Sequence, residues 1–412
     1  MQQVGLDIVS LPFWAKSIVF LLQLAHLKSV VMSYANEGEL SIACSEFASA
    51  FYKALASNVE GNLISSPLSA HIVLALLSRG AGGSTAEELN IGLKFSKRQQ
   101  ASHEGFKELL VTLNALDQVE LSLANTVYIH EGFELFQEFQ EHSLKYYNST
   151  IPTVDFENKV AAATEINRWI EENTNKKISN VILPVDISED TRVVLINAIY
   201  FKGPWAQKFD PALTKNREFY IARDKKVHIP TMEKSFAFKH GDLPELNAKF
   251  VEIPYFNQSL SMVIILPNEV EGLRSLEKSF EWNALSKGLL SSEKIALRLP
   301  RFKMETTMNL KDVLSKIGLQ GIFADDANFS NMSNVPLKVN RVIQKAFIEV
   351  NEDGSEAAAA SVVQMRLRRM IHEPEEFNVN HPFIFAIRHV PTNIPLFMGS
   401  VREFGTHIKD EL

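Results

Sequence analysis

The hydrophobic positions divide the chain into an early helical part and a later part that is rich in strands. Thr85 and Glu88 have the spacing of a capping box, which predicts a helix after the glycine-rich run at 80–83. Ser66 stands where it can cap the helix that follows it. Apolar side chains recur at helical spacing over 41–56, 67–77 and 161–170. Apolar runs of strand length then follow at 193–201, 260–266, 295–302, 342–350, 382–387 and 396–401.

This order of elements predicts an α+β fold, because the helices come first and no regular strand–helix alternation follows. The run at 193–201 is apolar at nearly every position, which predicts a strand buried on both faces. At about 150 residues per domain, the length of 412 residues suggests two or three domains. The chain has no internal repeat and no long linker, however, so we expect one large mixed domain.

Composition and charge exclude several classes of protein. The chain has 42 basic and 49 acidic residues and a net charge of −7, so it lacks the basic surplus that general nucleic-acid binding requires. Its one cysteine, Cys44, cannot form a disulfide within the chain. Cys44 lies inside a helical pattern, and we expect it to be a buried small hydrophobe rather than a nucleophile.

The N-terminal segment has the character of a secretory signal. The stretch 18–27 is apolar apart from Gln23 and His26, and a helix of ten residues spans only about 15 Å, too short to cross a bilayer. Small residues at 33–35 offer a cleavage site, so 1–35 is predicted to be a signal peptide, with no stable membrane insertion. The alternatives are an amphipathic N-terminal helix, or a start at Met32 that omits the segment.

The C-terminal end carries a second targeting signal. Lys409, Asp410, Glu411 and Leu412 form the KDEL signal that a receptor of the endoplasmic reticulum recognises. We therefore expect the protein in the lumen of the endoplasmic reticulum, with partial secretion, and the KDEL receptor as a partner. Four sequons for N-glycosylation agree with this location, at Asn148, Asn257, Asn328 and Asn331.

Motifs of catalysis are missing from the chain. The run 80–83 lacks the P-loop pattern, and neither an H-E-x-x-H motif nor a cysteine–histidine cluster is present. No G-x-S-x-G nucleophile elbow occurs either. The sequence therefore predicts no catalytic residue, no metal site and no cofactor.

Residues 351–376 are the unusual part of the chain. With a period of two, Ser355, Ala357, Ala359 and Ser361 share one face, and all four are small. A strand with such a face can enter between existing strands without a steric clash, while Glu356 points the other way. The arginine-rich stretch 366–369 is then a sequence that a protease with an acidic pocket would recognise and cleave. The simpler alternative is a solvated basic turn.

This segment, together with motifs elsewhere, resembles the serpin family from about Phe47 to Phe404. The Gly-Ser-Glu sequence and the four alanines after it are similar to the hinge of an inhibitory reactive-centre loop. The other matching motifs lie at 65–69, 166–169, 197–205, 299–303 and 377–387. The resemblance implies a single monomeric domain over 36–408 with a helical N-terminal part, three β-sheets of which one is large and central, and an exposed reactive-centre loop over about 351–376.

The resemblance also implies a mechanism. A serine protease attacks the loop and forms an acyl-enzyme, and the freed hinge then inserts into the central sheet as a new strand. Gln344 stands where many serpins carry a histidine of the shutter, which argues against a pH-dependent shutter. The implied shutter and breach residues are Ser66, Asn197, Trp205 and Gln344. The implied hinge comprises Gly354, Ser355, Glu356, Ala357, Ala358, Ala359, Ala360 and Ser361.

The sequence leaves two candidates for the reactive bond. Counting from Gly354 with the usual serpin spacing gives Arg368–Arg369, whereas the furin-like R-x-[KR]-R pattern gives Arg369–Met370, which we favour. Arg366, Leu367, Arg368 and Arg369 are the predicted recognition residues. The expected targets are furin-like proprotein convertases and other arginine-specific, trypsin-like proteases.

Three other functions are alternatives to inhibition. A non-inhibitory serpin chaperone of the endoplasmic reticulum shares the implied fold and the retention signal. A hydrolase lacks any supporting catalytic group. Lys94, Lys97 and Arg98 are too few to indicate activation by a glycosaminoglycan over a solvated helix end.

Overall fold

The computed structural model describes residues 38–354 and 374–404. The predicted signal peptide, the hinge after Gly354, the recognition residues, both reactive bonds and the retention signal lie outside the described residues. The described strands form three sheets, which together with the helices confirm the α+β fold.

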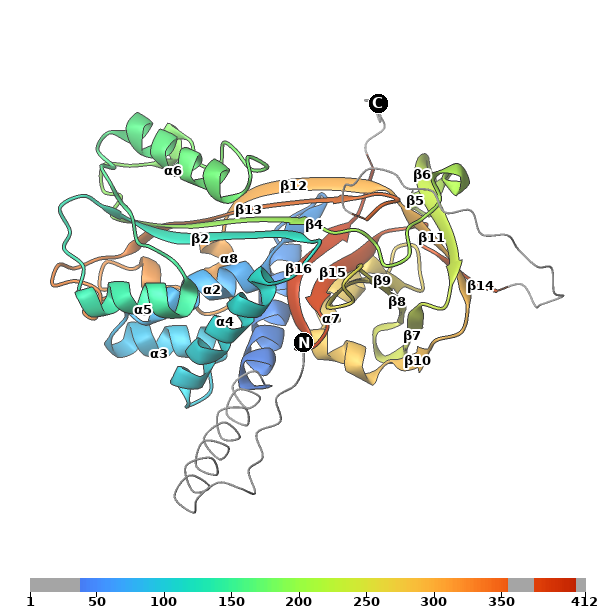
Figure 1. Ribbon diagram of the computed structural model, residues 1–412, viewed down its shortest axis with the longest axis horizontal. Helices are drawn as coiled ribbons and strands as arrows, with labels where there is room; N and C mark the ends of the chain where they lie inside the picture. The colour runs from blue at the N-terminus through green and yellow to red at the C-terminus, as the bar shows by residue number, and fades with distance from the viewer. Residues whose placement is uncertain (1–37, 355–373, 405–412) are drawn as a thin grey trace, which may run out of the picture.

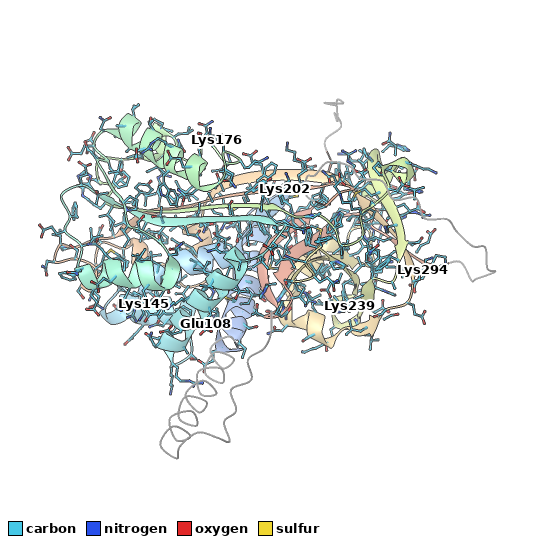
Figure 2. The ribbon with its side chains drawn as sticks, in the orientation of Figure 1. Glu108, Lys145, Lys176, Lys202, Lys239 and Lys294 are labelled. Carbon is cyan, nitrogen blue, oxygen red and sulfur yellow. The ribbon has the colours of Figure 1, made fainter. Side chains whose placement is uncertain are left out.

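A five-stranded sheet crosses the upper part of the molecule in Figure 1. Its strands lie in the order β12 (Phe302–Asn309), β13 (Val339–Val350), β4 (Val193–Lys202), β2 (Glu120–His130) and β3 (Thr153–Val154). Figure 2 places Lys202 at the end of β4 that is nearer the four-stranded sheet, and Lys145 on α5 toward the other end of the molecule.

Two further sheets fill the other half of the molecule. The seven-stranded sheet has the order β1 (Leu63–Ser65), β16 (Ile394–Val401), β15 (Phe383–His389), β9 (Leu260–Pro267), β8 (Ala248–Pro254), β7 (Lys239–Leu243) and β10 (Leu289–Ser291). The four-stranded sheet has the order β14 (Glu375–Asn378), β11 (Ile295–Pro300), β6 (Lys225–Phe236) and β5 (Lys215–Ala222).

Helices cover both faces of the five-stranded sheet (Figure 1). On one face lie the helix over 38–56, α2 (Pro67–Ser78), α3 (Gly83–Gly92), α4 (Gln99–Asn114) and α5 (Gln137–Tyr147). On the other lies α6 (Lys159–Asn173), and the shorter α7 (Leu273–Ser279) and α8 (Lys311–Lys316) pack elsewhere. The alternation of β4 explains this arrangement, because Leu195 and Ile199 join the core on the α2 side and Val194 and Ile196 join the core under α6.

Strand β4 is buried along nearly its whole length, as its apolar sequence predicted. Ser66 caps α2 as predicted, since its side chain accepts a hydrogen bond from the backbone N–H of Ser69. The capping box at Thr85 and Glu88 was wrong. Helix α3 begins at Gly83 without a side-chain cap, and Thr85 and Glu88 instead accept hydrogen bonds from the backbone N–H groups of Asn328 and Gly321.

Two strand predictions also change. The run 295–302 is divided between β11 and β12, which belong to different sheets, because the chain leaves the first sheet after Pro300. Strand β16 begins at Ile394, two residues before the predicted run at 396–401, so Pro395 lies within it. Pro395 pairs with Arg388 beside a bulge in β15, the kind of position where a strand tolerates a residue without an N–H.

Candidate functional site

The centre of the five-stranded sheet is a pair of parallel strands, β13 and β4. Their pairing runs from Val339↔Val193 to Phe347↔Tyr200, whereas the strands themselves continue to Val350 and Lys202. The flanking strands β12 and β2 are antiparallel to these two. A chain that turns back after β13 and enters between β13 and β4 would run antiparallel to both. It would convert one parallel pairing into two antiparallel ones, the slightly more stable arrangement.

The boundary between β13 and β4 is called the seam below. Two buried amide side chains, of Gln344 and Asn197, join the two strands at its centre. Gln344 of β13 and Asn197 of β4 are direct neighbours in the sheet, and both are fully buried. Gln344 Nε2 donates a hydrogen bond to Asn197 Oδ1 over 2.6 Å. Because adjacent strands lie about 4.8 Å apart, an inserted strand would double the separation of β13 and β4 and break this bond.

Gln344 also joins the seam to the start of α2. Its Oε1 accepts from the backbone N–H of Ser66 at 2.9 Å, and its Nε2 donates to the backbone carbonyl of Ser66 at 2.9 Å. Ser66 Oγ in turn donates to the carbonyl of Leu396 on β16 at 2.6 Å. The structure thus brings together three of the four implied shutter and breach residues, Ser66, Asn197 and Gln344, in one network that links α2 to two sheets.

Two further side chains extend this network to β2. Asn197 Nδ2 donates to Ser69 Oγ and to Asn125 Oδ1, each at 2.6 Å, and Ser69 Oγ donates to Asn125 Oδ1 at 2.6 Å. Ser69 belongs to a motif noted from the sequence, but Asn125 was missed. The signal that was available is an amide in the middle of the strand-like run 121–129, where the other polar side chains are hydroxyls.

Trp205, the fourth predicted residue, lies apart from this network, beyond the end of β4. Its side chain is almost fully buried and stacks on Tyr255 with 4.5 Å between ring centroids. Its indole N–H donates to the carbonyl of Asn351 at 2.9 Å, and its backbone N–H donates to the carbonyl of Asp353 at 2.9 Å. Trp205 therefore holds the segment that leads from β13 into the predicted hinge.

Charged and polar side chains reinforce the same contact. Lys208 Nζ bonds Asp353 Oδ1 at 2.9 Å, and Thr214 Oγ1 donates to Glu352 Oε1 at 2.6 Å. Arg301 Nε lies 3.6 Å from the other oxygen of Glu352. The sequence did not identify these partners, because they come from three segments that are distant along the chain.

Gly354 is the first residue of the predicted hinge and the last one described before 374, and its position requires glycine. Its φ is +128°, and it bridges to Pro204. A Cβ atom at this position would lie 2.1 Å from the carbonyl oxygen of Gly203. The close approach of the two backbones keeps the start of the hinge pressed against the end of β4.

The far end of the loop is fastened to the four-stranded sheet through β14, which pairs in parallel with β11. Arg298 of β11 bonds Glu376 of β14 at 2.8 Å and Glu233 of β6 at 3.3 Å. Arg217 of β5 also pairs with Glu233. This row of alternating charges crosses all four strands, so the two ends of the loop are held by different sheets.

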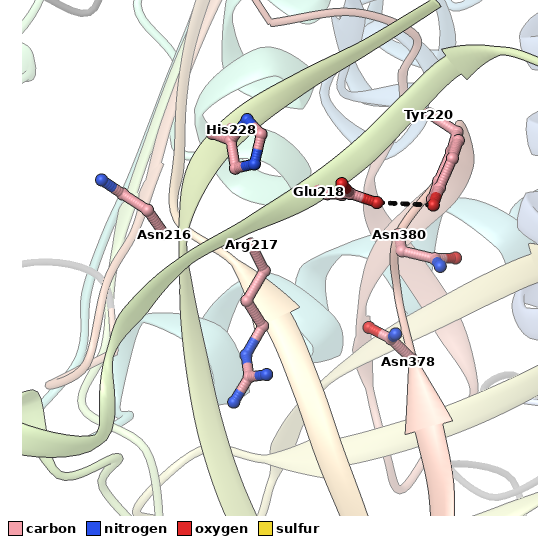
Figure 3. A pocket seen from close by; sticks show the side chains of 7 residues that line it. All are labelled: Asn216, Arg217, Glu218, Tyr220, His228, Asn378 and Asn380. Atoms are coloured by element: carbon pink, nitrogen blue, oxygen red, sulfur yellow. Dashed lines mark hydrogen bonds between the residues drawn. The ribbon is translucent and has the colours of Figure 1, made fainter. Parts of the chain in front are cut away.

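A polar depression of about 370 Å³ lies beside β14 (Figure 3). The bond from Lys226, together with the hydrogen bond that the Tyr220 hydroxyl donates at 2.6 Å, holds the pKa of the Glu218 carboxyl below its usual value. Small-molecule sites are mostly apolar, so this lining does not indicate one. The lining residues are Asn216, Arg217, Glu218, Tyr220, His228, Asn378 and Asn380.

Cys44 is buried, as the sequence predicted, and burial raises the pKa of its thiol. Its Sγ lies 3.3 Å from His71 Nδ1 inside an aromatic cluster, where a protease-like nucleophile has no access to substrate. Among residues 38–354 and 374–404, no group of histidine, cysteine, aspartate and glutamate side chains is arranged to hold a metal ion. Within the same ranges, no helix combines the length and the apolar character that crossing a membrane requires.

Comparison with known proteins identifies relatives that share this architecture. Residues 42–404 match the family model described as serpin (serine protease inhibitor). Antichymotrypsin-2 of Bombyx mori is 37% identical over 355 residues, which cover 85% of this chain and 94% of the relative. Antitrypsin of the same species is 37% identical over 345 residues, which cover 82% and 88%. The structure of Serpin48 from Tenebrio molitor, called a highly specific serpin, superposes with a TM-score of 0.82 at 34% identity and covers 89% of this chain and 98% of that one.

Proposed function

We propose that this chain, which belongs to the serpin family of serine protease inhibitors, is a suicide substrate that traps arginine-specific proteases of the secretory pathway. Its relatives include proteins named antichymotrypsin, antitrypsin and leukocyte elastase inhibitor. The observation that carries the mechanism is the parallel seam between β13 and β4, since the segment that follows β13 is the predicted hinge.

In the proposed mechanism, a serine protease attacks the loop and becomes esterified to it. Cleavage separates the hinge from β14, which stays in the four-stranded sheet. The hinge then leaves Trp205 and Lys208 and enters the seam as an antiparallel strand. Insertion breaks the bond between Gln344 and Asn197 but adds a full set of ladder hydrogen bonds on both sides of the new strand. The tethered protease is carried along and distorted before the ester is hydrolysed.

The choice of target rests on the loop sequence. Arg366, Leu367, Arg368 and Arg369 fit the furin-like R-x-[KR]-R pattern, with Arg369–Met370 as the favoured reactive bond. Convertase pockets are acidic, and paired arginine–carboxylate contacts are among the strong hydrogen bonds. The predicted signal peptide and the KDEL sequence would place the inhibitor in the same compartment as these proteases.

The decisive experiment incubates the purified full chain with a panel of convertases and trypsin-like proteases and scores complexes that survive SDS. We expect stable complexes with furin-like and trypsin-like enzymes. Mass spectrometry of the peptide released from the complex identifies the reactive bond, with Met370 at its new N-terminus if the favoured assignment holds. Complete turnover of the loop without any stable complex would contradict inhibition.

A non-inhibitory serpin chaperone remains the second candidate, because the KDEL sequence suits it equally well. The two functions differ in what loop cleavage does to stability. An inhibitor inserts its cleaved loop, so its melting temperature rises sharply after cleavage. A chaperone that does not insert its loop melts at the same temperature before and after cleavage.

A further inference from the structure

The four sequons differ in how the structure presents the amide nitrogen that a glycan would use. Asn148 ends helix α5 in the left-handed conformation, with φ 48° and ψ 36°. The residue is exposed, and Thr150, the third residue of its sequon, is exposed as well. Lys145, one turn earlier on the same helix, lies on the outer surface in Figure 2. A bulky sugar at this helix end therefore projects into solvent.

Asn257 presents the opposite environment. Its Oδ1 accepts a hydrogen bond from the backbone N–H of Ser259 at 3.1 Å, which fixes the orientation of the side chain. Its Nδ2 is then buried, and it has no hydrogen-bond partner within the described residues. A sugar is attached through this nitrogen, so the folded structure has no room for a glycan on Asn257.

The remaining two sequons lie in one loop that packs against the start of α3. Asn331 Nδ2 donates to the carbonyl of Ala81 at 2.8 Å. The side chain of Asn328 lies against Gly82 and Gly83, where a Cβ atom on Gly83 would come within 3.2 Å of the Asn328 amide nitrogen. A glycan on either residue would displace contacts that join this loop to α3.

We infer that the folded protein carries an N-linked oligosaccharide on Asn148 and none on Asn257. In the transfer, Asn148 Nδ2 forms a bond to C1 of the first sugar of a polyisoprenyl-pyrophosphate-linked oligosaccharide. The C1–O bond to the pyrophosphate breaks, the lipid pyrophosphate leaves with the electron pair, and the amide loses one proton. The inference rests on the secretory location in the proposed function.

The position of Asn148 is compatible with loop insertion. The next two residues of the sequon cross the outer edge of β2, because Ser149 Oγ donates to the carbonyl of Asn125 at 3.0 Å and Thr126 Oγ1 donates to the carbonyl of Thr150 at 2.9 Å. In the order of the sheet, this edge lies on the far side of β4 from the seam with β13. The glycan therefore leaves the seam free and covers an edge that β3 pairs only at Ile129 and His130.

Two matched variants of the full chain test the assignment in insect cells. Thr150→Ala removes the Asn148 sequon while Asn148 keeps its left-handed backbone, and Ser259→Ala removes the Asn257 sequon while the backbone N–H of residue 259 remains. The protein is treated with peptide N-glycosidase in ¹⁸O water, and its peptides are analysed by mass spectrometry. We expect ¹⁸O-labelled aspartate at position 148. Only Thr150→Ala should remove that label, and both variants should inhibit proteases as the wild type does.

Two results would overturn the assignment. One is a label at position 257 in the monomeric, inhibitory fraction, and the other is the absence of a label at position 148. Cell fractionation then separates the causes. A chain without a glycan inside the secretory pathway rejects this site alone, whereas a chain that never enters the pathway also rejects the proposed location.

Discussion

Gln344 of β13 and Asn197 of β4 face each other across the central, parallel pairing of the five-stranded sheet. A hydrogen bond of 2.6 Å joins Gln344 Nε2 to Asn197 Oδ1. Both side chains are fully buried, and each has further partners in Ser66 or Ser69. The bond thus closes the seam in the native state without any titratable group. Inhibition by loop insertion requires that it opens.

Replacing Gln344 by leucine should destabilise the native form and affect the cleaved form less. The substitution leaves the backbone N–H of Ser66 and the Oδ1 of Asn197 buried without a partner, and each such group costs about 1–3 kcal/mol. The carbonyl of Ser66 keeps the hydrogen bond from the Ala70 N–H. In the cleaved form, loop insertion is expected to have separated the pair already. Thermal melts of both forms measure the difference, with Gln137→Leu on the exposed face of α5 as the control. An equal fall in both forms would contradict this role.

Gly354→Ala should weaken the backbone contact between the start of the hinge and the segment after β4. A Cβ atom there collides with the carbonyl of Gly203 and also faces the strain of a positive φ. We expect a lower native melting temperature and faster spontaneous loss of inhibitory activity. Gly132→Ala is the control, because Gly132 has φ +86° but nothing within 4 Å of an added Cβ. If both variants behave alike, backbone strain rather than the contact with Gly203 is responsible.

Ser355→Arg should convert the inhibitor into a substrate. The small face of the predicted hinge has to enter between β13 and β4, and a long charged side chain on that face slows insertion until hydrolysis of the acyl-enzyme is faster. The SDS-stable complex is then replaced by cleaved loop. Glu356→Arg, on the opposite face, should keep the complex. Persistence of the complex in Ser355→Arg would falsify the insertion account.

Arg366→Ala should separate two classes of target. Loss of a charge-assisted pair with a convertase costs about 1.5–3 kcal/mol, or about tenfold to a hundredfold in the association rate. Trypsin-like proteases that recognise a single arginine should be inhibited at the wild-type rate, so the same preparation provides its own control. Equal losses for both classes would show that Arg366 has no specific role with convertases.

The native form should lose stability as the pH falls below about 6.5. Burial lowers the pKa of His71 to about 3, of His103 to about 3 and of His389 to about 4. Below pH 6.5 the unfolded chain therefore binds protons that the folded chain does not. Each histidine then removes up to about 1.4 kcal/mol per pH unit until its folded pKa is reached.

Denaturant titrations of the native form at pH 7.5, 6.5 and 5.5 measure this dependence. His71→Gln should reduce the slope of stability against pH between 6.5 and 5.5. A stability that does not vary over this range would contradict the assignment of neutral buried histidines.

Local patterns predicted most of the elements of the fold. The apolar run of β4, the cap of α2 at Ser66 and the helix around Cys44 all follow from residues that are close together in the chain. These local rules failed where a residue distant along the chain provides the contact instead. Asn328 and Gly321 use the groups of Thr85 and Glu88 that the sequence had assigned to a capping box, and the bulge beside Arg388 allows Pro395 inside a strand.

The sequence by itself determined the periodicity and the chemistry of each segment, including the small face of the hinge, the arginines of the loop and the absence of catalytic motifs. Only the tertiary structure decided which segments are neighbours. Gln344 and Asn197 are 147 residues apart in the chain, and the contacts of Trp205 with Asn351 and of Lys208 with Asp353 span similar separations. Periodicity specifies which face of a strand is buried, but the pairing of two strands depends on how whole layers pack around a common core.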